Sequence, residues 1–437
     1  MKRRNHGIGT SFFVFLVVVS VVFLSVSRSA ASGFALIEQS VSGLGNAYAG
    51  GAAGAEDAAT IYYNPAGMTR LKGSQVLLGG HLIIPSAKFN NQGSTRRNGT
   101  SLGLDNGDNA GVTALVPNFY LSHNLNNNIV VGLGINSPFG LITDYGNTWV
   151  GRYHATKTDM LSININPSIA YKADEHLSFG AGVSAQYIKV QYDSMIDNLL
   201  VGGRTDGSVN HKGDSWGFGF NAGALIEVTK DARIGLAYRS SVKQLLSGTA
   251  DFTNLALPLI ALGYVDTRIT AELTMPDTVS LSGYYAFNDQ WSIMGDVTWT
   301  NWSDFKEVRI KYTSGAPDGL TTTDWKDSWR YSLGLTYRPD PAWAIRTGIA
   351  LDKSPVRNAE HRTPRIPDAD RLWLACGVSY AASKTVNFDL GYVHIFVNDP
   401  QVNLIATATN ENRLRGNLRG TIDAQVNIVS AQLRLTF

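Results

Sequence analysis

Apolar and polar residues alternate along many short segments of this 437-residue chain. Leu161, Ile163 and Ile165, for example, interleave with serine and asparagine. The same period of two recurs at residues 216–224, 234–238, 331–337 and 386–392. This period is typical of a β-strand whose two faces differ. No apolar run after residue 31 reaches the ~20 residues of a membrane-spanning helix. The remaining folds are therefore a soluble sandwich and a closed membrane barrel.

The connections between these segments alternate between two lengths. Short turns lie at residues 126–128, 173–175, 230–231, 288–289, 339–341 and 382–383. Long polar or irregular segments lie at residues 90–109, 141–156, 194–212, 253–265, 314–323, 353–368 and 399–424. Outer-membrane barrels combine an even strand number with short periplasmic turns and long extracellular loops, whereas a sandwich has no reason to sort its loops. The sequence therefore predicts an all-β fold, a roughly 14-stranded antiparallel transmembrane β-barrel over residues 73–437.

Tryptophans lie close to both kinds of connection. Trp291 and Trp343 are beside short turns, and Trp216, Trp325 and Trp329 are beside long segments. Aromatic side chains at both strand ends indicate the two interfacial girdles of a membrane barrel. Ordinary core tryptophans are the alternative.

The last strand ends on an aromatic residue. Leu433, Leu435 and Phe437 alternate with polar side chains that are expected to face inward. This ending looks like the C-terminal signature of barrels that the outer-membrane assembly machinery inserts. That machinery, outer-membrane lipid and lipopolysaccharide are therefore expected partners.

The N-terminus indicates secretion. Lys2, Arg3 and Arg4 precede an apolar run at residues 12–24 and then small residues. These features predict a signal peptide over residues 1–31, with a retained membrane anchor as the alternative. The expected location is the bacterial outer membrane.

Residues 32–72 do not alternate and are rich in glycine and alanine. Asn64, Pro65 and Ala66 form a turn-favouring cluster there. A compact element inside the barrel lumen is expected, because irregular backbone is tolerated where lipid does not reach it. A disordered periplasmic tail is the alternative.

Charge and motifs exclude several classes of function. Without the four basic residues of the predicted signal, 33 basic and 35 acidic residues remain, so nucleic acid is not an expected partner. Cys376 is the single cysteine, and no spaced histidine pair accompanies it. We therefore expect no disulfide framework, metal site or cofactor. The eight histidines are scattered along the sequence, which does not favour a Ser-His-acid triad, and we expect neither catalytic residues nor enzymatic activity.

Several motifs carry a resemblance to a known family. They are Ser42-Gly43-Leu44-Gly45-Asn46-Ala47-Tyr48-Ala49-Gly50, Asn64-Pro65-Ala66, residues 216–223, Tyr238-Arg239-Ser240, residues 346–350, Ser354-Pro355 and residues 366–374. Together they resemble the FadL-type long-chain fatty acid transporters over nearly the whole mature chain. The resemblance implies a barrel with an N-terminal hatch in the lumen. It also implies a capture groove on the third and fourth extracellular loops, an internal fatty-acid pocket, and a kinked third strand that opens sideways.

The two expected capture loops are unusually apolar. The candidate capture residues are Met195, Ile196, Leu199, Leu200, Leu255, Leu257, Leu259, Ile260 and Leu262. Exposed apolar clusters often mark binding surfaces. Packing of the two loops on each other is the alternative, and the two roles are compatible.

The third strand is broken after residue 135. The candidate lateral gate is Asn136, Ser137, Pro138, Phe139 and Gly140, where proline cannot donate a ladder hydrogen bond. Unpaired backbone at membrane depth suggests an opening. If Pro138 lies above the membrane, it only ends the strand.

Two basic residues are candidates for a carboxylate site. Lys189 and Arg309 each stand between apolar neighbours that are expected to face lipid, so both are predicted to face the lumen. They look equivalent to basic residues near the family's fatty-acid headgroup, and an ion pair with Glu307 is the alternative for Arg309. By resemblance, Phe34 reaches the same pocket.

The sequence thus predicts a passive outer-membrane channel for long-chain fatty acids. A general porin for hydrophilic solutes is expected to lack both the hatch and the apolar loops. Uptake of aromatic or aliphatic hydrocarbons by the same route remains an alternative. An adhesin or purely structural barrel is the alternative of a different class.

Overall fold

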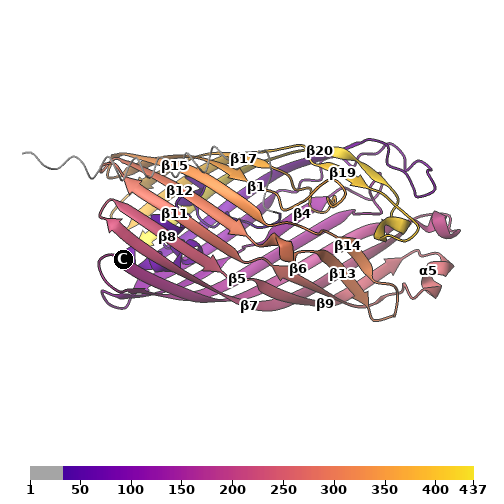
Figure 1. Ribbon diagram of the computed structural model, residues 1–437, viewed down its shortest axis with the longest axis horizontal. Helices are drawn as coiled ribbons and strands as arrows, with labels where there is room; N and C mark the ends of the chain where they lie inside the picture. The colour runs from indigo at the N-terminus through magenta and orange to yellow at the C-terminus, as the bar shows by residue number, and fades with distance from the viewer. Residues whose placement is uncertain (1–32) are drawn as a thin grey trace, which may run out of the picture.

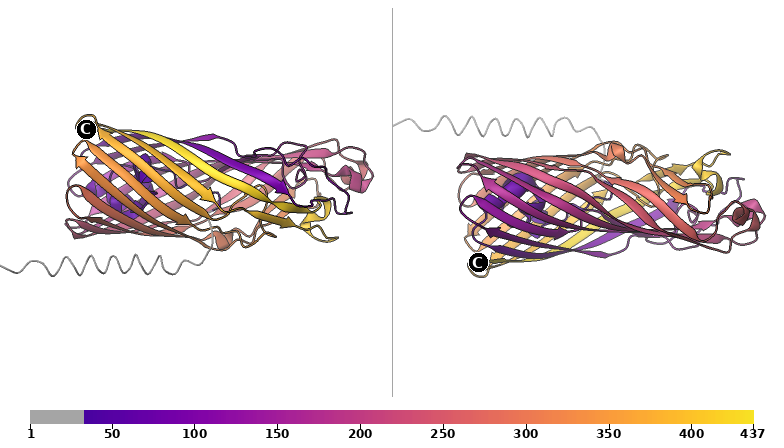
Figure 2. Two further views of the ribbon diagram at one scale, coloured as in Figure 1. Left: turned by 90° about the horizontal axis from the view of Figure 1, so that it is seen from above. Right: turned by 90° about the horizontal axis from the view of Figure 1, so that it is seen from below.

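Fourteen antiparallel wall strands close into one cylinder in the computed structural model, which describes residues 33–437 (Figure 1, Figure 2). The cylinder closes where β1 pairs with β20, from Gln75↔Thr436 to Asn91↔Gly420. The predicted barrel is confirmed. The signal peptide predicted for residues 1–31 lies outside the described residues. No helix within residues 33–437 is long and apolar enough to cross a bilayer.

Several wall strands are interrupted and consist of two pieces. The strands are β1 (Gln75–Asn91), β2 (Ala114–Asn124), β3 (Ile129–Asn136) with β4 (Gly140–Asp144), β5 (Lys157–Lys172), β6 (Leu177–Ile196), β7 (Gly207–Thr229), β8 (Ala232–Arg239) with β9 (Val242–Thr253), β10 (Thr267–Met275) with β11 (Thr278–Ala286), β12 (Trp291–Thr300) with β13 (Glu307–Tyr312), β14 (Gly319–Thr322) with β15 (Ser328–Asp340), β16 (Trp343–Asp352), β17 (Arg371–Ala381), β18 (Val386–Val397) and β20 (Leu418–Thr436). A short β19 (Gln401–Leu404) adds to β20 in the last long loop.

Alternation sorts side chains between lipid and lumen in the lower and middle wall. On β5, Ser162, Asn164 and Asn166 are buried, while Leu161 and Ile163 are exposed on the outer face. The ladder of a closed barrel gives the backbone N–H and C=O groups of the wall strands hydrogen-bond partners, which lipid cannot provide. The apolar outer face can then remain in hydrocarbon.

Aromatic pairs mark both ends of the outer face. Trp343 packs on Tyr380 at 4.6 Å between ring centroids, beside a short turn. Trp216 packs on Tyr187 at 5.4 Å, nearer the long loops. The girdle prediction is wrong for Trp325, which is 1% exposed and points inward.

Residues 33–72, here called the plug segment, lie inside the barrel wall (Figure 1, Figure 2). The segment folds into α2 (Val41–Gly45), α3 (Gly51–Gly54), α4 (Thr60–Tyr63) and the 3₁₀ helix η1 (Pro65–Arg70). Wall side chains bind its carbonyl groups: Arg233 Nε donates to Ala53 O at 3.0 Å, and Arg330 Nη2 donates to Ala47 O at 2.7 Å. The plug segment therefore occupies the lumen at this level and contacts the wall directly.

Inward-facing glycines let the plug segment approach the wall. A Cβ at Gly235 would overlap Ala52 O, and one at Gly348 would overlap the backbone of Asn46. Gly180 meets the backbone of Ala66 in the same way. The wall needs glycine at these positions because it contacts backbone directly.

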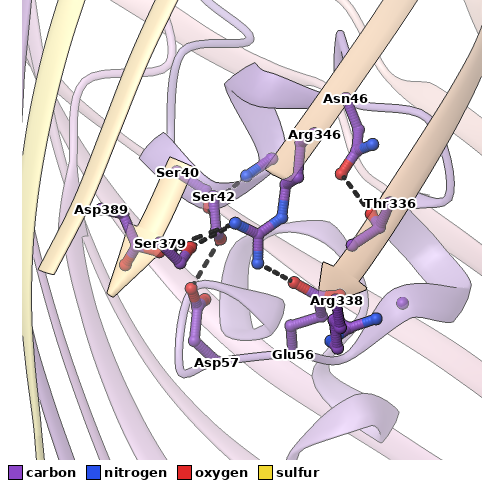
Figure 3. A network of polar contacts seen from close by, with 12 residues as sticks. Ser40, Ser42, Asn46, Glu56, Asp57, Thr336, Arg338, Arg346, Ser379 and Asp389 are labelled. Atoms are coloured by element: carbon purple, nitrogen blue, oxygen red, sulfur yellow. Dashed lines mark hydrogen bonds and ion pairs between the residues drawn. The ribbon is translucent and has the colours of Figure 1, made fainter. Parts of the chain in front are cut away.

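Ion pairs add a second anchor (Figure 3). Glu56 in the plug segment accepts from Arg338 Nη2 and Arg346 Nη2, each at 2.8 Å. Burial raises the pKa of Glu56, but Arg346 and Arg338 lower it more, so the carboxyl stays ionised. Arg346 also lies 3.8 Å from Asp389. The Arg346 pair is the more buried of the two, with side chains 7% and 21% exposed, and it ties the plug segment to β16.

Candidate functional site

The third wall strand leaves a gap beside β2. β2 pairs with β3 only from Asn124↔Val130 to Phe119↔Ile135. After the break, β4 pairs with β5, and no ladder joins β4 to β2 in the described chain. An isolated bridge, Gly111↔Thr143, rejoins the two sides farther along. The predicted break at residues 136–140 is therefore a bounded interruption of the wall.

Side chains satisfy the backbone that the break leaves unpaired. Phe139 N–H donates to Ser162 Oγ at 2.9 Å, and Ser162 Oγ donates to Phe139 O at 2.6 Å. Ser137 Oγ donates to Ser162 O at 2.6 Å. Pro138 has no N–H to satisfy. The break is thus stabilised by serine hydroxyls in place of a ladder.

The first residues of the plug segment also cover the gap. In the plug tip, residues 33–39, Leu36 N–H donates to Pro138 O at 2.8 Å, and Gly140 N–H donates to Phe34 O at 3.1 Å. Gln39 Nε2 donates to Ser137 O at 2.8 Å. The plug tip therefore acts as a short strand on the free edge of the wall.

Phe34 is the centre of a packed aromatic cluster, which its own ring fills and which is here called the aromatic pocket. Its ring lies 4.8 Å from Trp302, 5.5 Å from Phe305, 5.9 Å from Trp325 and 6.0 Å from Phe139, measured between ring centroids. The 3₁₀ helix η3 (Trp302–Asp304) stands at the interruption between β12 and β13, which turns its tryptophan inward. The predicted pocket residue Phe34 thus lies among aromatic side chains. The period-of-two rule did not predict these partners, because they lie where the strands are broken.

Lys189 does not face this pocket. Its neighbours Ile188 and Val190 are 0% and 7% exposed and pack with the aromatic pocket, while Lys189 is exposed on the outer face. The prediction of a lumen-facing Lys189 is wrong. It assumed that apolar residues face lipid, but here the lumen is apolar and the outer face has passed the Trp216 girdle, where water and headgroups replace hydrocarbon.

The Arg309 side chain also points outward instead of toward the lumen, for the same reason. Val308 is buried toward the pocket, and the Arg309 guanidinium pairs with Glu307 at 2.6 Å and Asp318 at 3.2 Å on the exposed side. The prediction that Arg309 faces the lumen is therefore also wrong. Its ion pair with Glu307 was the alternative, although it forms outside the lumen.

Arg365 is an inward-facing cation near the aromatic pocket that the sequence reasoning missed. It lies in the β16–β17 connection beside Ile366, and a loop has no periodicity that could predict its direction. Its Nη1 donates to Lys157 O and its Nη2 to Asp193 O, both at 3.0 Å. The guanidinium lies 4.5 Å from the ring centroid of Tyr192. No carboxylate of the described residues lies within ion-pair distance of it. Burial lowers the pKa of Arg365 to about 10, so it is charged at neutral pH.

A cavity of about 690 Å³ passes through the gap. Its inner lining includes the plug tip, Asp368 and Arg371. Its outer lining includes Asp159 and the apolar wall side chains Leu78, Leu115, Ile135, Leu161 and Ile163. Small-molecule sites have volumes of roughly 300–1,000 Å³. This lateral cavity is therefore large enough for a lipid-like ligand.

The third and fourth extracellular loops contact each other at the far end of the barrel, where α5 (Leu257–Ala261) lies (Figure 1). Asn198 Nδ2 donates to Asn254 O at 2.6 Å, and Ala256 N–H donates to Asn198 Oδ1 at 3.1 Å. The loops thus pack together through polar groups, yet they leave Leu199, Leu257, Ile260, Leu262 and Val265 exposed.

Some candidate capture residues lie elsewhere than expected. Met195 and Ile196 are the last part of β6 and are half-buried, because the strand continues farther than its polarity predicted. Leu259 is the buried residue of α5, while Leu200 and Leu255 are half-buried. The exposed capture surface is consequently smaller than the predicted set.

The Asn64-Pro65-Ala66 motif connects the plug segment to the wall. Asn64 Oδ1 accepts from Ala66 N–H at 3.1 Å. Asn64 Nδ2 donates to Ala224 O on β7 at 3.0 Å. Asn64 therefore both caps the N-terminus of η1 and binds the plug segment to β7.

Comparisons with known proteins agree with this architecture. The sequence matches the family described as "Outer membrane protein transport protein (OMPP1/FadL/TodX)" over residues 21–437. It is 34% identical over 416 residues to the "Long-chain fatty acid transport protein" of Escherichia coli O6:H1, which covers 88% of this chain and 92% of that protein. A Pseudomonas aeruginosa FadL homologue superimposes with a TM-score of 0.86 at 25% identity, covering 93% of this chain and all of that chain. The Pseudomonas putida toluene transporter TodX shares the fold, with a TM-score of 0.68 at 16% identity over 93% of this chain and 100% of that chain.

Proposed function

The chain belongs to the outer-membrane transport family OMPP1/FadL/TodX, and from this premise we propose that it carries long-chain fatty acids passively across the outer membrane. The observation that carries the proposal is the lateral cavity, which connects the plug tip with lipid-facing side chains. A relative that is 34% identical bears the name of a long-chain fatty acid transport protein. Transport by this route needs no energy source, since each buried CH₂ group favours transfer by about 0.8 kcal/mol.

The proposed route has three stages. A fatty acid first lands on the exposed leucines of the third and fourth loops, then moves to the aromatic pocket. There it displaces Phe34, and the plug tip leaves the free edge at Pro138 and Gly140. The acyl chain then passes through the lateral cavity into the bilayer. The apolar outer residues Leu161 and Ile163 beside the gap support an exit at hydrocarbon depth.

Uptake of radiolabelled oleate by cells with and without the protein tests this function. We expect uptake only with the protein, and an adhesin or purely structural barrel would give none. Leu257→Asp with Leu262→Asp is expected to lower initial uptake about tenfold, because each exposed leucine contributes roughly 1 kcal/mol or more of apolar contact. Leu104→Asp, in a different loop and more exposed, is the matched control. Equal uptake by the double variant and the control would contradict capture on this surface.

Arg365 is proposed to bind the ligand carboxylate. Arg365→Gln is expected to weaken oleate binding roughly 10- to 100-fold, because a hydrogen bond to a charged group contributes about 1.5–3 kcal/mol. Binding of oleyl alcohol, which has no charge, is expected to stay the same. Displacement of a fluorescent fatty acid from the purified protein measures both affinities.

The control for Arg365→Gln is a double variant of the two basic residues that the sequence analysis assigned to the carboxylate site. Lys189→Ala with Arg309→Ala is expected to leave oleate binding unchanged, because both side chains lie on the outer face. If this double variant weakens binding and Arg365→Gln does not, the assignment to Arg365 is wrong.

Aromatic hydrocarbons are a second candidate cargo. The aromatic rings around Phe34 favour this candidate, since they present an uncharged surface to a flat apolar ligand that takes the place of the Phe34 ring. Competition binding tests whether the two ligands share a site. If toluene displaces oleate from the purified protein, both ligands bind in one pocket. Hydrocarbon uptake is expected to be insensitive to Arg365→Gln.

A further inference from the structure

Glu38 is a buried acid with no hydrogen-bond partner for one of its oxygens. The residue lies in the plug tip, is 5% exposed and lines the lateral cavity. Within the described chain, its Oε2 is buried and makes no hydrogen bond. An ionised carboxylate in such a place is costly. An unpaired acid beside a large cavity therefore indicates a group that acts on whatever passes through.

The charges around Glu38 do not hold it ionised. Burial raises its pKa to about 7, and this effect exceeds the opposing influence of the neighbouring arginines. The charged and titratable groups that act on it or are influenced by it are Arg371, Arg330, Asp352, Tyr48 and Tyr62, and Asp368 lines the same cavity. Arg371 is already paired with Asp368, at 2.7 Å between Nη2 and Oδ1. Glu38 thus carries a proton below about pH 7 and loses it as the pH rises.

A fatty acid that leaves sideways must lose its charge. At the outer end, the exposed side chains that line the lateral cavity are mainly apolar and include Leu78, Leu115, Ile135, Leu161 and Ile163. None of them can pair with a carboxylate, and an unpaired charge in hydrocarbon is strongly unfavourable. Arg371, at the plug-tip end, is the cationic side chain in the lining of the lateral cavity, and Asp159 on the wall is an acid that cannot pair with a carboxylate. Neutralisation at that point removes the barrier to exit.

We propose that Glu38 protonates the carboxylate of the departing fatty acid inside the lateral cavity, so that the acid enters the bilayer uncharged. The inference rests on the proposed function. The O–H bond of Glu38 breaks, and a new O–H bond forms on the ligand oxygen. Arg371, on the same cavity, balances the negative charge before and after the transfer. The Glu38 carboxylate then regains its proton from bulk water that enters once the ligand has left.

Two ligands of equal length separate this role from a structural one. Outer-membrane vesicles from cells carrying the full chain are given radiolabelled oleate or oleyl alcohol, and the label that reaches the lipid fraction is counted over time. Glu38→Gln keeps the shape of the side chain but cannot donate its proton in this way. It is expected to slow oleate transfer about tenfold or more, since proton transfer by a positioned acid contributes factors of about 10²–10⁴. Oleyl alcohol transfer is expected to be unchanged.

The pH profile provides a second readout. Oleate transfer by the wild type is expected to fall as the pH rises through about 7, where Glu38 loses its proton. Glu38→Gln is expected to lack that fall, oleyl alcohol transfer is expected to be flat with pH, and Glu38→Asp is expected to restore most of the oleate rate.

Three results would overturn the proposal. One is oleate transfer by Glu38→Gln equal to that of the wild type at every pH. Another is an equal loss of oleate and alcohol transfer, which would mean a structural role. The third is wild-type transfer of both ligands no faster than in vesicles without the protein, which would reject the proposed function as well.

Discussion

Replacing Gly235 and Gly348 together with leucine is expected to displace the plug segment and convert the closed barrel into an ion-conducting pore. Side chains at these positions would occupy the space of the backbone at Ala52 and Asn46. Backbone cannot yield as a flexible side chain does. Overpacking costs about 1–3 kcal/mol at each site, which shifts the docking equilibrium by a factor between about 30 and 10⁴. Single-channel currents in planar bilayers measure the effect.

The control for this variant is a glycine on the opposite face of the wall. A Cβ at Gly295 would meet only Ser332 O, at 3.8 Å, so Gly295→Leu is expected to remain closed. Heat-dependent migration on gels shows whether each barrel is folded. A folded double variant with wild-type currents would mean that the plug segment tolerates the overlap and is not held by these contacts.

Replacing Pro138 and Gly140 with valine is expected to stop the release of ligand to the membrane. Valine at residue 138 restores a backbone N–H, and both valines favour extended strand, so the third strand can continue beside residues 114–118 of β2. Delivery of oleate to the lipid is expected to fall at least about tenfold. Binding to the purified protein is expected to remain, because Arg365, Trp302, Phe305 and Trp325 all lie outside the replaced segment.

Pro167→Val with Gly295→Val is the matched control, since both residues lie on wall strands outside the break. This control is expected to deliver oleate at the wild-type rate. Undiminished delivery by the Pro138 and Gly140 variant would exclude lateral exit at this place, and loss of binding would show that the substitutions had altered the pocket instead.

The wall was predictable from the sequence because lipid and lumen impose a strict period of two. Leu161 and Ile163 were correctly placed on the outer face by that rule. The rule failed for Lys189 because it describes only the part of the wall that touches hydrocarbon. Above the girdle, the outer face becomes polar, and the lumen becomes apolar where a ligand is expected to bind. The period of two is unchanged there, but polar side chains face outward and apolar side chains face the lumen.

The site was harder to predict because its residues lie outside regular strands. Trp302 and Trp325 turn inward at strand interruptions, and Arg365 enters the lumen from a loop. No local pattern encodes such directions, since long-range packing fixes them. The break at Pro138 was predictable because proline removes a donor, but the serine hydroxyls that satisfy its surroundings come from another strand.

The plug segment is attached in two different ways, and this has a consequence for the cell. Its base is fixed by the Glu56 ion pairs and by backbone contact with wall glycines, whereas its tip is held by a few hydrogen bonds and aromatic contacts. Cargo that dislodges the tip therefore leaves the base in place. On the proposed route, nutrient entry therefore requires no continuous aqueous passage to the periplasm, and the permeability barrier against toxic hydrophilic solutes stays intact during transport.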